Sequence, residues 1–181
     1  MFQPNACRLG REVHAALRSR YGPALNSRFS QGIWSGVAWN FPPKAVSVPH
    51  RDANNPPAFP CVVSSGGDFD ADVGGMIVLW DLGIFVRFPP TSTVMLTSGD
   101  CTHFNVPVRP TESRWSVTQY MAGPLITWVR RQFRKESELT AAEKAEEKAA
   151  RTRRGDRHLY STVSELEEDR RRLLKAERSF L

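Results

Sequence analysis

The sequence lacks any apolar run long enough to cross a membrane. Its best candidate, residues 76–88, is interrupted by Asp81 and Arg87 and falls short of the ~20 residues that a spanning helix needs. Residues 1–10 do not show the basic and then apolar pattern of a secretory signal. We therefore expect a protein with no membrane partner.

Cysteine is also scarce, with Cys7, Cys61 and Cys101 among 181 residues. Three widely spaced cysteines favour reduced thiols and an intracellular location over a disulfide framework. A chain of this length buries roughly two thirds of its unfolded surface, so it needs neither disulfides nor a structural zinc. Apolar residues make up 40% and aromatic residues 10% of the chain, which is typical of a globular protein.

Charge and proline divide the chain into two parts. Residues 1–127 hold 10 Lys/Arg and 8 Asp/Glu, whereas residues 128–181 hold 15 and 11 and no proline. Most of the net charge of +6 therefore lies in the second part. This composition predicts a Pro/Gly-rich body followed by a charged, helical tail.

The body contains short apolar runs separated by Pro, Gly, Asn and Asp. The expected strands are residues 33–39, 45–49, 59–64, 75–80, 84–88, 93–97, 103–106 and 114–121. Eight short strands at close spacing favour an all-β sandwich or barrel over alternating βαβ units. We predict a mainly β protein with two facing sheets, that is, a jelly roll or cupin-like double-stranded β-helix.

Helical patterns flank these strands. Leu9, Val13 and Leu17 recur at helical spacing before the Gly22-Pro23 stop, and Thr140-x-x-Glu143 is a capping-box pattern. We therefore predict three segments. They are an N-terminal helical segment over residues 1–29, the β-helix core over 30–123 and a helical C-terminal extension over 124–181.

Two histidines and one aspartate in the body form a candidate metal site. His50 and Asp52 are two residues apart at the end of an expected strand, so their side chains can share a face. His103 begins a later strand and supplies a third ligand. Two histidines and a carboxylate are the facial triad of non-haem Fe(II) oxygenases, which leaves positions open for a bidentate co-substrate and dioxygen. We expect no catalytic residue beyond these three ligands.

The last expected strand carries a candidate co-substrate anchor. Arg114 and Ser116 are two residues apart and face the same way along the strand. Arginine offers a planar fork for a carboxylate, and the serine hydroxyl adds a third donor. This pair predicts a clamp for the distal carboxylate of 2-oxoglutarate.

These motifs together resemble the 2-oxoglutarate and Fe(II)-dependent dioxygenases. Residues 50–55 (HRDANN) are similar to the His-Arg-Asp-x-x-Asn motif of the TET/JBP branch, and residues 114–120 (RWSVTQY) are similar to its Arg-x-Ser-x-x-x-Tyr motif. Residues 67–75 (GDFDADVGG) resemble a set of fungal, transposon-associated members. The likeness covers about residues 30–130.

The resemblance implies a substrate and two further site residues. The TET/JBP branch oxidises the methyl group of 5-methylcytosine or thymine in DNA, with Fe(II), 2-oxoglutarate and O2. It implies that Asn55 is a hydrogen-bonding partner of the target base and Tyr120 a stacking platform. On the residues alone, Asn55 is equally a turn residue before two prolines, whereas the pattern around Tyr120 favours an ordinary core residue.

Other functions stay open at this point. The enzyme could act on protein side chains or small molecules, or the chain could be an inactive β-barrel that binds nucleic acid, or a cupin-like binding module. The basic stretch at residues 151–154 could be a phosphate contact or a nuclear address, but we favour a solvated helical face. We expect an intracellular protein, which is nuclear if this stretch is an address.

Overall fold

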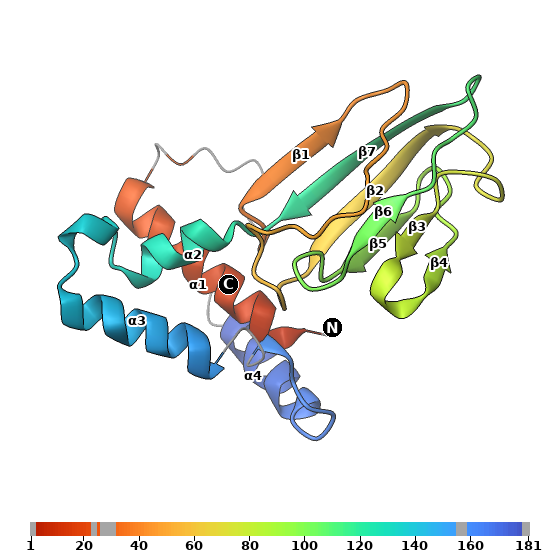
Figure 1. Ribbon diagram of the computed structural model, residues 1–181. Coiled ribbons are helices and arrows are strands. Elements are labelled where there is room, and N and C mark those ends of the chain that lie inside the picture. Colours follow the sequence, from red (N-terminus) through yellow and green to blue (C-terminus); the bar gives the residue numbers. More distant parts are fainter. Residues whose placement is uncertain (1–2, 23–24, 26–31, 155–158, 179–181) are drawn as a thin grey trace. The chain divides into compact units, whose positions relative to one another are not determined.

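The computed structural model of this protein describes residues 3–22, 25, 32–154 and 159–178 (Figure 1). The chain forms two compact units, one made of residues 36–121 and the other of residues 1–35 with 122–181. The division into three segments, 1–29, 30–123 and 124–181, stays a prediction. The side chains of the basic stretch 151–154 lie outside the described part of the structure.

The unit of residues 36–121 contains two antiparallel sheets. The larger sheet has the strand order β1-β7-β2-β5, and the smaller sheet has the order β4-β3-β6 (Figure 1). The strands are β1 (Gly36–Asn40), β2 (Cys61–Asp68), β3 (Ile77–Leu79), β4 (Ile84–Val86), β5 (Thr93–Leu96), β6 (His103–Asn105) and β7 (Ser113–Tyr120). A short 3-10 helix, η2 (Trp80–Leu82), joins β3 to β4.

The strand predicted at residues 45–49 is not a regular strand. It is an extended connector that touches the larger sheet through the Lys44–Arg114 bridge and the smaller sheet through the His50–His103 bridge. Between these bridges the amide of Asn105 donates to the carbonyl of Ser47 at 3.4 Å. Regular pairing fails because the prolines around this connector lack a backbone donor, and because it passes from one sheet to the other.

Successive elements alternate between the two sheets. β1 belongs to the larger sheet, the connector leads to the smaller one, β2 returns, and β3 and β4 cross again. β5, β6 and β7 continue the alternation. This winding is the topology of a double-stranded β-helix, so the predicted fold class is confirmed.

The two-residue repeat of β7 decides which side chains face inward. Arg114 and Ser116 are buried, whereas Trp115 between them is exposed. Trp115 lies against Gly66 on β2, where an added Cβ would come within 2.1 Å of the indole ring. The alternation therefore places polar side chains on the inner face, between sheets whose core includes Phe59, Phe88 and Leu96.

The second unit is helical among its described residues. Its helices are α1 (Pro4–Tyr21), α2 (Gly123–Arg130), α3 (Ala141–Arg154) and α4 (Leu166–Arg178), with a 3-10 turn, η3 (Glu136–Glu138). The predicted stop after α1 is confirmed, since Gly22 caps it. The capping box before α3 is also confirmed, because Thr140 and Glu143 each bond the other's backbone amide. No described helix has the length and apolar character to span a bilayer.

Candidate metal centre and its cavity

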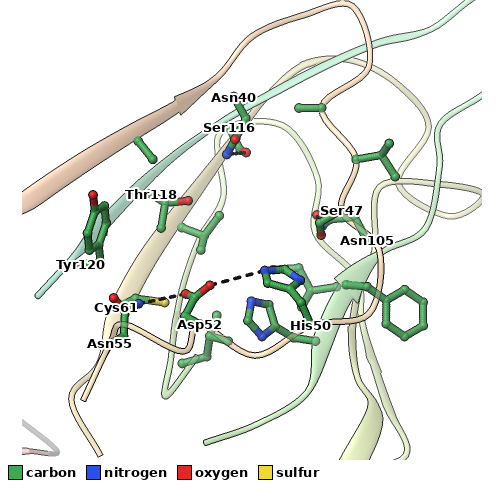
Figure 2. A pocket seen from close by; sticks show the side chains of 18 of the residues that line it. Asn40, Ser47, His50, Asp52, Asn55, Cys61, Asn105, Ser116, Thr118 and Tyr120 are labelled. Carbon is green, nitrogen blue, oxygen red and sulfur yellow. Dashed lines mark hydrogen bonds and ion pairs between the residues drawn. The ribbon is translucent and has the colours of Figure 1, made fainter. Parts of the chain in front are cut away.

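A cavity of about 750 Å³ opens in the strand unit and is lined by residues of both sheets and of the connector (Figure 2). Its lining includes all seven residues that the sequence singled out, namely His50, Asp52, Asn55, His103, Arg114, Ser116 and Tyr120. The fold therefore brings together residues that lie up to 70 positions apart in the chain.

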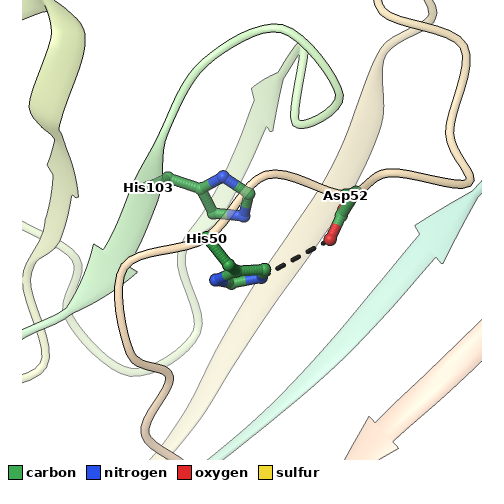
Figure 3. Close-up of side chains that lie close together, drawn as sticks. All are labelled: His50, Asp52 and His103. Atoms are coloured by element: carbon green, nitrogen blue, oxygen red, sulfur yellow. Dashed lines mark ion pairs between the residues drawn. The ribbon is translucent and has the colours of Figure 1, made fainter.

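His50 and His103 lie directly opposite each other. Their backbones form an antiparallel bridge, in which the two residues exchange hydrogen bonds of 3.1 and 2.9 Å. Their rings project to the same side, with centroids 4.4 Å apart (Figure 3). This pairing explains why a histidine on the connector and one on β6 can bind the same metal ion.

Backbone carbonyls orient both imidazoles. Nδ1 of His50 lies 2.8 Å from the carbonyl oxygen of Val48, and Nδ1 of His103 lies 3.0 Å from that of Cys101. A carbonyl only accepts, so each neutral ring carries its proton on Nδ1 and presents an unprotonated Nε2. This arrangement prepares both Nε2 atoms for a metal ion.

Asp52 completes the cluster. Its Oδ1 lies 3.4 Å from Nε2 of His50, and one ligand atom from each of His50, Asp52 and His103 lies within 4.8 Å of the others. Two imidazoles and one carboxylate in this spacing could hold one cation. The donor set suits Fe(II) and leaves coordination positions open.

Arg51 points away from these ligands, as its place between His50 and Asp52 predicts. Its guanidinium donates to Thr102 Oγ1 and to Asp81 Oδ2, both at 3.0 Å. The same Asp81 oxygen accepts the backbone amide of Thr102 at 2.7 Å, and this bond is the main reason that the pKa of Asp81 is lowered. Arg51 thus ties the His50–Asp52 turn to the residue that precedes His103.

Arg114 is a buried cation, with 2% of its surface exposed. Its Nη1 donates to the carbonyl oxygen of Ala45 at 2.5 Å, but its buried Nε has no hydrogen-bond partner. No carboxylate among the described residues forms an ion pair with it. Burial lowers the pKa of this arginine. An uncompensated charge and an unused donor in a cavity are what an anionic ligand would satisfy.

Ser116 lies beside Arg114 on the cavity face of β7. Its hydroxyl accepts a hydrogen bond of 3.0 Å from the amide of Asn40 on β1. Ser47 and Asn105 form another polar pair on the cavity wall, at 3.1 Å. No local sequence pattern marks Asn40, Ser47 and Asn105 as site residues, because each is placed by pairing between segments that are distant in the chain.

Asn55 contacts the predicted metal ligand Asp52 through the carboxylate oxygen that does not face His50. Its Nδ2 donates to Asp52 Oδ2 at 2.9 Å and to Ser98 Oγ at 3.1 Å, so both amide protons are used. Its Oδ1 has no hydrogen-bond partner among the described residues. Asn55 therefore offers the cavity an acceptor rather than a donor.

Tyr120 lies at the end of β7, on the cavity wall (Figure 2). It pairs with Gly36 on β1, where an added Cβ would come within 2.7 Å of the tyrosine ring. The absence of a side chain at Gly36 lets this ring lie across the neighbouring strand. Trp39 and Phe41 also line the cavity and are 60% and 75% exposed, which makes one edge of it aromatic.

No family model matches the chain, and no curated protein matches it. The solved structure of NgTET1 in complex with 5mC DNA is similar over 67% of this chain and 50% of that chain, with 15% identity and a TM-score of 0.47. The match thus spans half the length of that protein.

A second solved structure is a viral collagen prolyl hydroxylase, vCPH, from Paramecium Bursaria Chlorella virus-1, in complex with 2OG. It is similar over 61% of this chain and 73% of that chain, with 14% identity and a TM-score of 0.35.

Proposed function

We propose that the chain is a 2-oxoglutarate- and Fe(II)-dependent dioxygenase. The observation that carries this proposal is Arg114, a buried cation without an acidic partner in the described structure, which lines the same cavity as the His50, Asp52 and His103 cluster. A metal cluster alone would fit many metalloproteins. A separate, unsatisfied carboxylate anchor in the same cavity favours a co-substrate with a carboxylate at its far end.

Each site residue then has a stated task. His50 Nε2, His103 Nε2 and Asp52 Oδ1 would hold the metal ion, and Arg114 with Ser116 would hold the distal carboxylate of 2-oxoglutarate. Bound Fe(II), 2-oxoglutarate and O2 supply the oxidation of a substrate C–H bond to an alcohol, with succinate and CO2 as co-products. The protein contributes the placement of the substrate C–H bond and the exclusion of water.

We further propose 5-methylcytosine in DNA as the substrate. The motif resemblance supports this choice, and a base must leave the stack to reach a cavity of this kind. Tyr120 offers an aromatic face for it. Both protons of Asn55 Nδ2 are used, and its Oδ1 accepts no hydrogen bond within the described structure. An acceptor suits the exocyclic amine of 5-methylcytosine and not the carbonyl oxygen that thymine has at this position. A nuclear location would accompany this substrate.

A second candidate substrate, a protein side chain or a small molecule, is favoured by the charge of the strand unit. Residues 36–121 contain five Lys/Arg and seven Asp/Glu, a net charge of −2. Nucleic-acid binding surfaces are usually basic. The exposed Trp39 and Phe41 at the cavity edge suit an apolar substrate as well as a base.

Mass spectrometry distinguishes these functions. Purified protein with Fe(II), ascorbate and 2-oxoglutarate is incubated with matched duplexes that contain 5-methylcytosine, thymine or unmodified cytosine. We expect an oxidised base, and succinate above the rate seen without substrate, only with 5-methylcytosine. Succinate formation without any oxidised base, and stimulated by a peptide or small-molecule pool, would remove the DNA substrate and keep the dioxygenase. No consumption of 2-oxoglutarate under any condition would remove the dioxygenase.

A further inference from the structure

We infer that Asn55 and Ser98 are positioning residues that hold Asp52 so that it presents a single oxygen to the metal ion. This inference rests on the proposed function, because it assigns Asp52 as a metal ligand. It gives Asn55 a task beyond the substrate contact that the motif resemblance implies.

The two oxygens of Asp52 have different surroundings. Oδ1 faces Nε2 of His50 at 3.4 Å, whereas Oδ2 accepts a hydrogen bond of 2.9 Å from Nδ2 of Asn55. A carboxylate whose second oxygen is bonded to a fixed donor cannot turn freely to bind a metal ion with both oxygens. Asn55 would therefore keep the ligand monodentate and leave positions open for the co-substrate.

Ser98 in turn fixes Asn55 and the backbone of Asp52. Its hydroxyl accepts the second proton of the Asn55 amide at 3.1 Å, and its carbonyl accepts the backbone amide of Asp52 at 3.0 Å. Ser98 is completely buried, and its hydrogen bond to the Cys61 thiol opposes the rise in the pKa of that thiol that burial causes. The support of Asp52 is thus anchored in the core rather than on the surface.

Gly99 allows this close packing. A Cβ at this position would lie 2.8 Å from the carbonyl oxygen of Asn55 and 3.2 Å from Cα of Pro57. The turn after β5 can therefore press against residues 55–57 only because residue 99 has no side chain. Asn55, Ser98 and Gly99 together form a support built from two segments that are more than 40 residues apart.

Metal affinity tests the inference without relying on turnover. Co(II) serves as an oxygen-stable probe, its dissociation constant is measured by calorimetry, and its absorption spectrum reports the coordination. The variants are Asn55→Ala and the size-matched Asn55→Leu. Asn54→Ala is the control, because Asn54 is an exposed neighbour that also lines the cavity.

We expect both Asn55 variants to bind Co(II) about 10- to 100-fold more weakly than wild type, with an altered spectrum, while Asn54→Ala binds as wild type does. We also expect Ser98→Ala to weaken binding by itself and to add little in the Asn55→Leu background, since both act through Asp52. Thermal unfolding of each variant separates this effect from a loss of folding.

Three results would contradict us in different ways. Wild-type Co(II) affinity and spectrum in a folded Asn55→Leu protein would overturn the positioning role and leave the dioxygenase proposal standing. A wild-type protein that binds neither Co(II) nor Fe(II) would overturn both. A change confined to the KM for the organic substrate would show that Asn55 is a substrate contact alone.

Discussion

His50 and His103 are a hydrogen-bonded cross-strand pair whose rings lie 4.4 Å apart. The bond between their backbones does not depend on either side chain, so the sheet holds two imidazoles side by side at no cost in strand pairing. Asp52, two residues after His50, places its carboxylate beside the same two imidazoles.

His103→Ala is the direct test of this pair. Because the backbone bridge remains, we expect thermal unfolding close to that of wild type. We expect Fe(II) binding and the formation of succinate without substrate to fall below detection, since one of the three ligands is lost. The measurements are calorimetry with Fe(II) under anaerobic conditions and succinate detection. Turnover like that of wild type would remove the assignment of this cluster.

We expect Arg114→Met to weaken the binding of 2-oxoglutarate without lowering the unfolding temperature. Removing a buried charge that has no acidic partner in the described structure is neutral or stabilising when an apolar side chain of similar size replaces it. We therefore expect an unfolding temperature at least as high as that of wild type. Loss of the carboxylate anchor should raise the KM for 2-oxoglutarate on the order of 100-fold or more.

The control for this prediction is Arg109→Met, because Arg109 is exposed and forms ion pairs with Asp70 and Glu112. We expect it to keep the wild-type KM for 2-oxoglutarate. A second comparison is thermal unfolding with metal ion alone and with metal ion plus 2-oxoglutarate. The added 2-oxoglutarate should stabilise wild type and Arg109→Met but not Arg114→Met. An unchanged KM in Arg114→Met would exclude the carboxylate anchor.

Gly36→Ala tests the place of Tyr120 in substrate binding. The new methyl group would lie within 2.7 Å of the tyrosine ring, so the ring must move. If Tyr120 stacks on a base, we expect the KM for methylated DNA to rise roughly tenfold. Succinate formation without substrate should stay near the wild-type rate and serves as the internal control. A normal KM together with a displaced Tyr120 would show that this ring is only part of the core.

We expect Glu143, at the start of α3, to make a pH-dependent contribution to the free energy of unfolding. Hydrogen bonding from Arg134, and then from the Thr140 backbone, lowers its pKa from 4.5 to about 2. The folded state therefore binds this proton less tightly than the unfolded state. The stabilisation is fully present above pH 4.5 and is lost as the pH falls toward 2.

We test this by comparing urea unfolding of wild type and Glu143→Gln across that range. We expect wild type to be more stable near pH 6 and the difference to shrink steadily below pH 4.5. The effect should be modest and should weaken in high salt, because Glu143 is only partly buried. A difference that does not depend on pH would assign the effect to the amide substitution itself.

Local patterns in the sequence were sufficient to predict the helix ends and strands that depend on residues close together in the chain. The stop at Gly22 and the Thr140–Glu143 box follow from capping chemistry within one turn. Seven of the eight expected strands form, since short apolar runs between Pro and Gly clusters favour strands in most tertiary contexts. The segment at residues 45–49 fails as a regular strand because it must change sheets, and no local signal reports that.

The sequence by itself determined the ligand types, the His-x-Asp spacing and the Arg-x-Ser repeat, because side chains two residues apart share a face in extended chain. Only the tertiary structure decided the rest. The backbone pairing between the connector and β6 places His50 opposite His103. The winding of the sheets buries Arg114 without an acidic partner among the described residues. Close packing at Gly99 brings Ser98 into contact with Asn55. These relationships join segments distant in the chain, so they arise from the shared packing of two sheets and not from any local pattern.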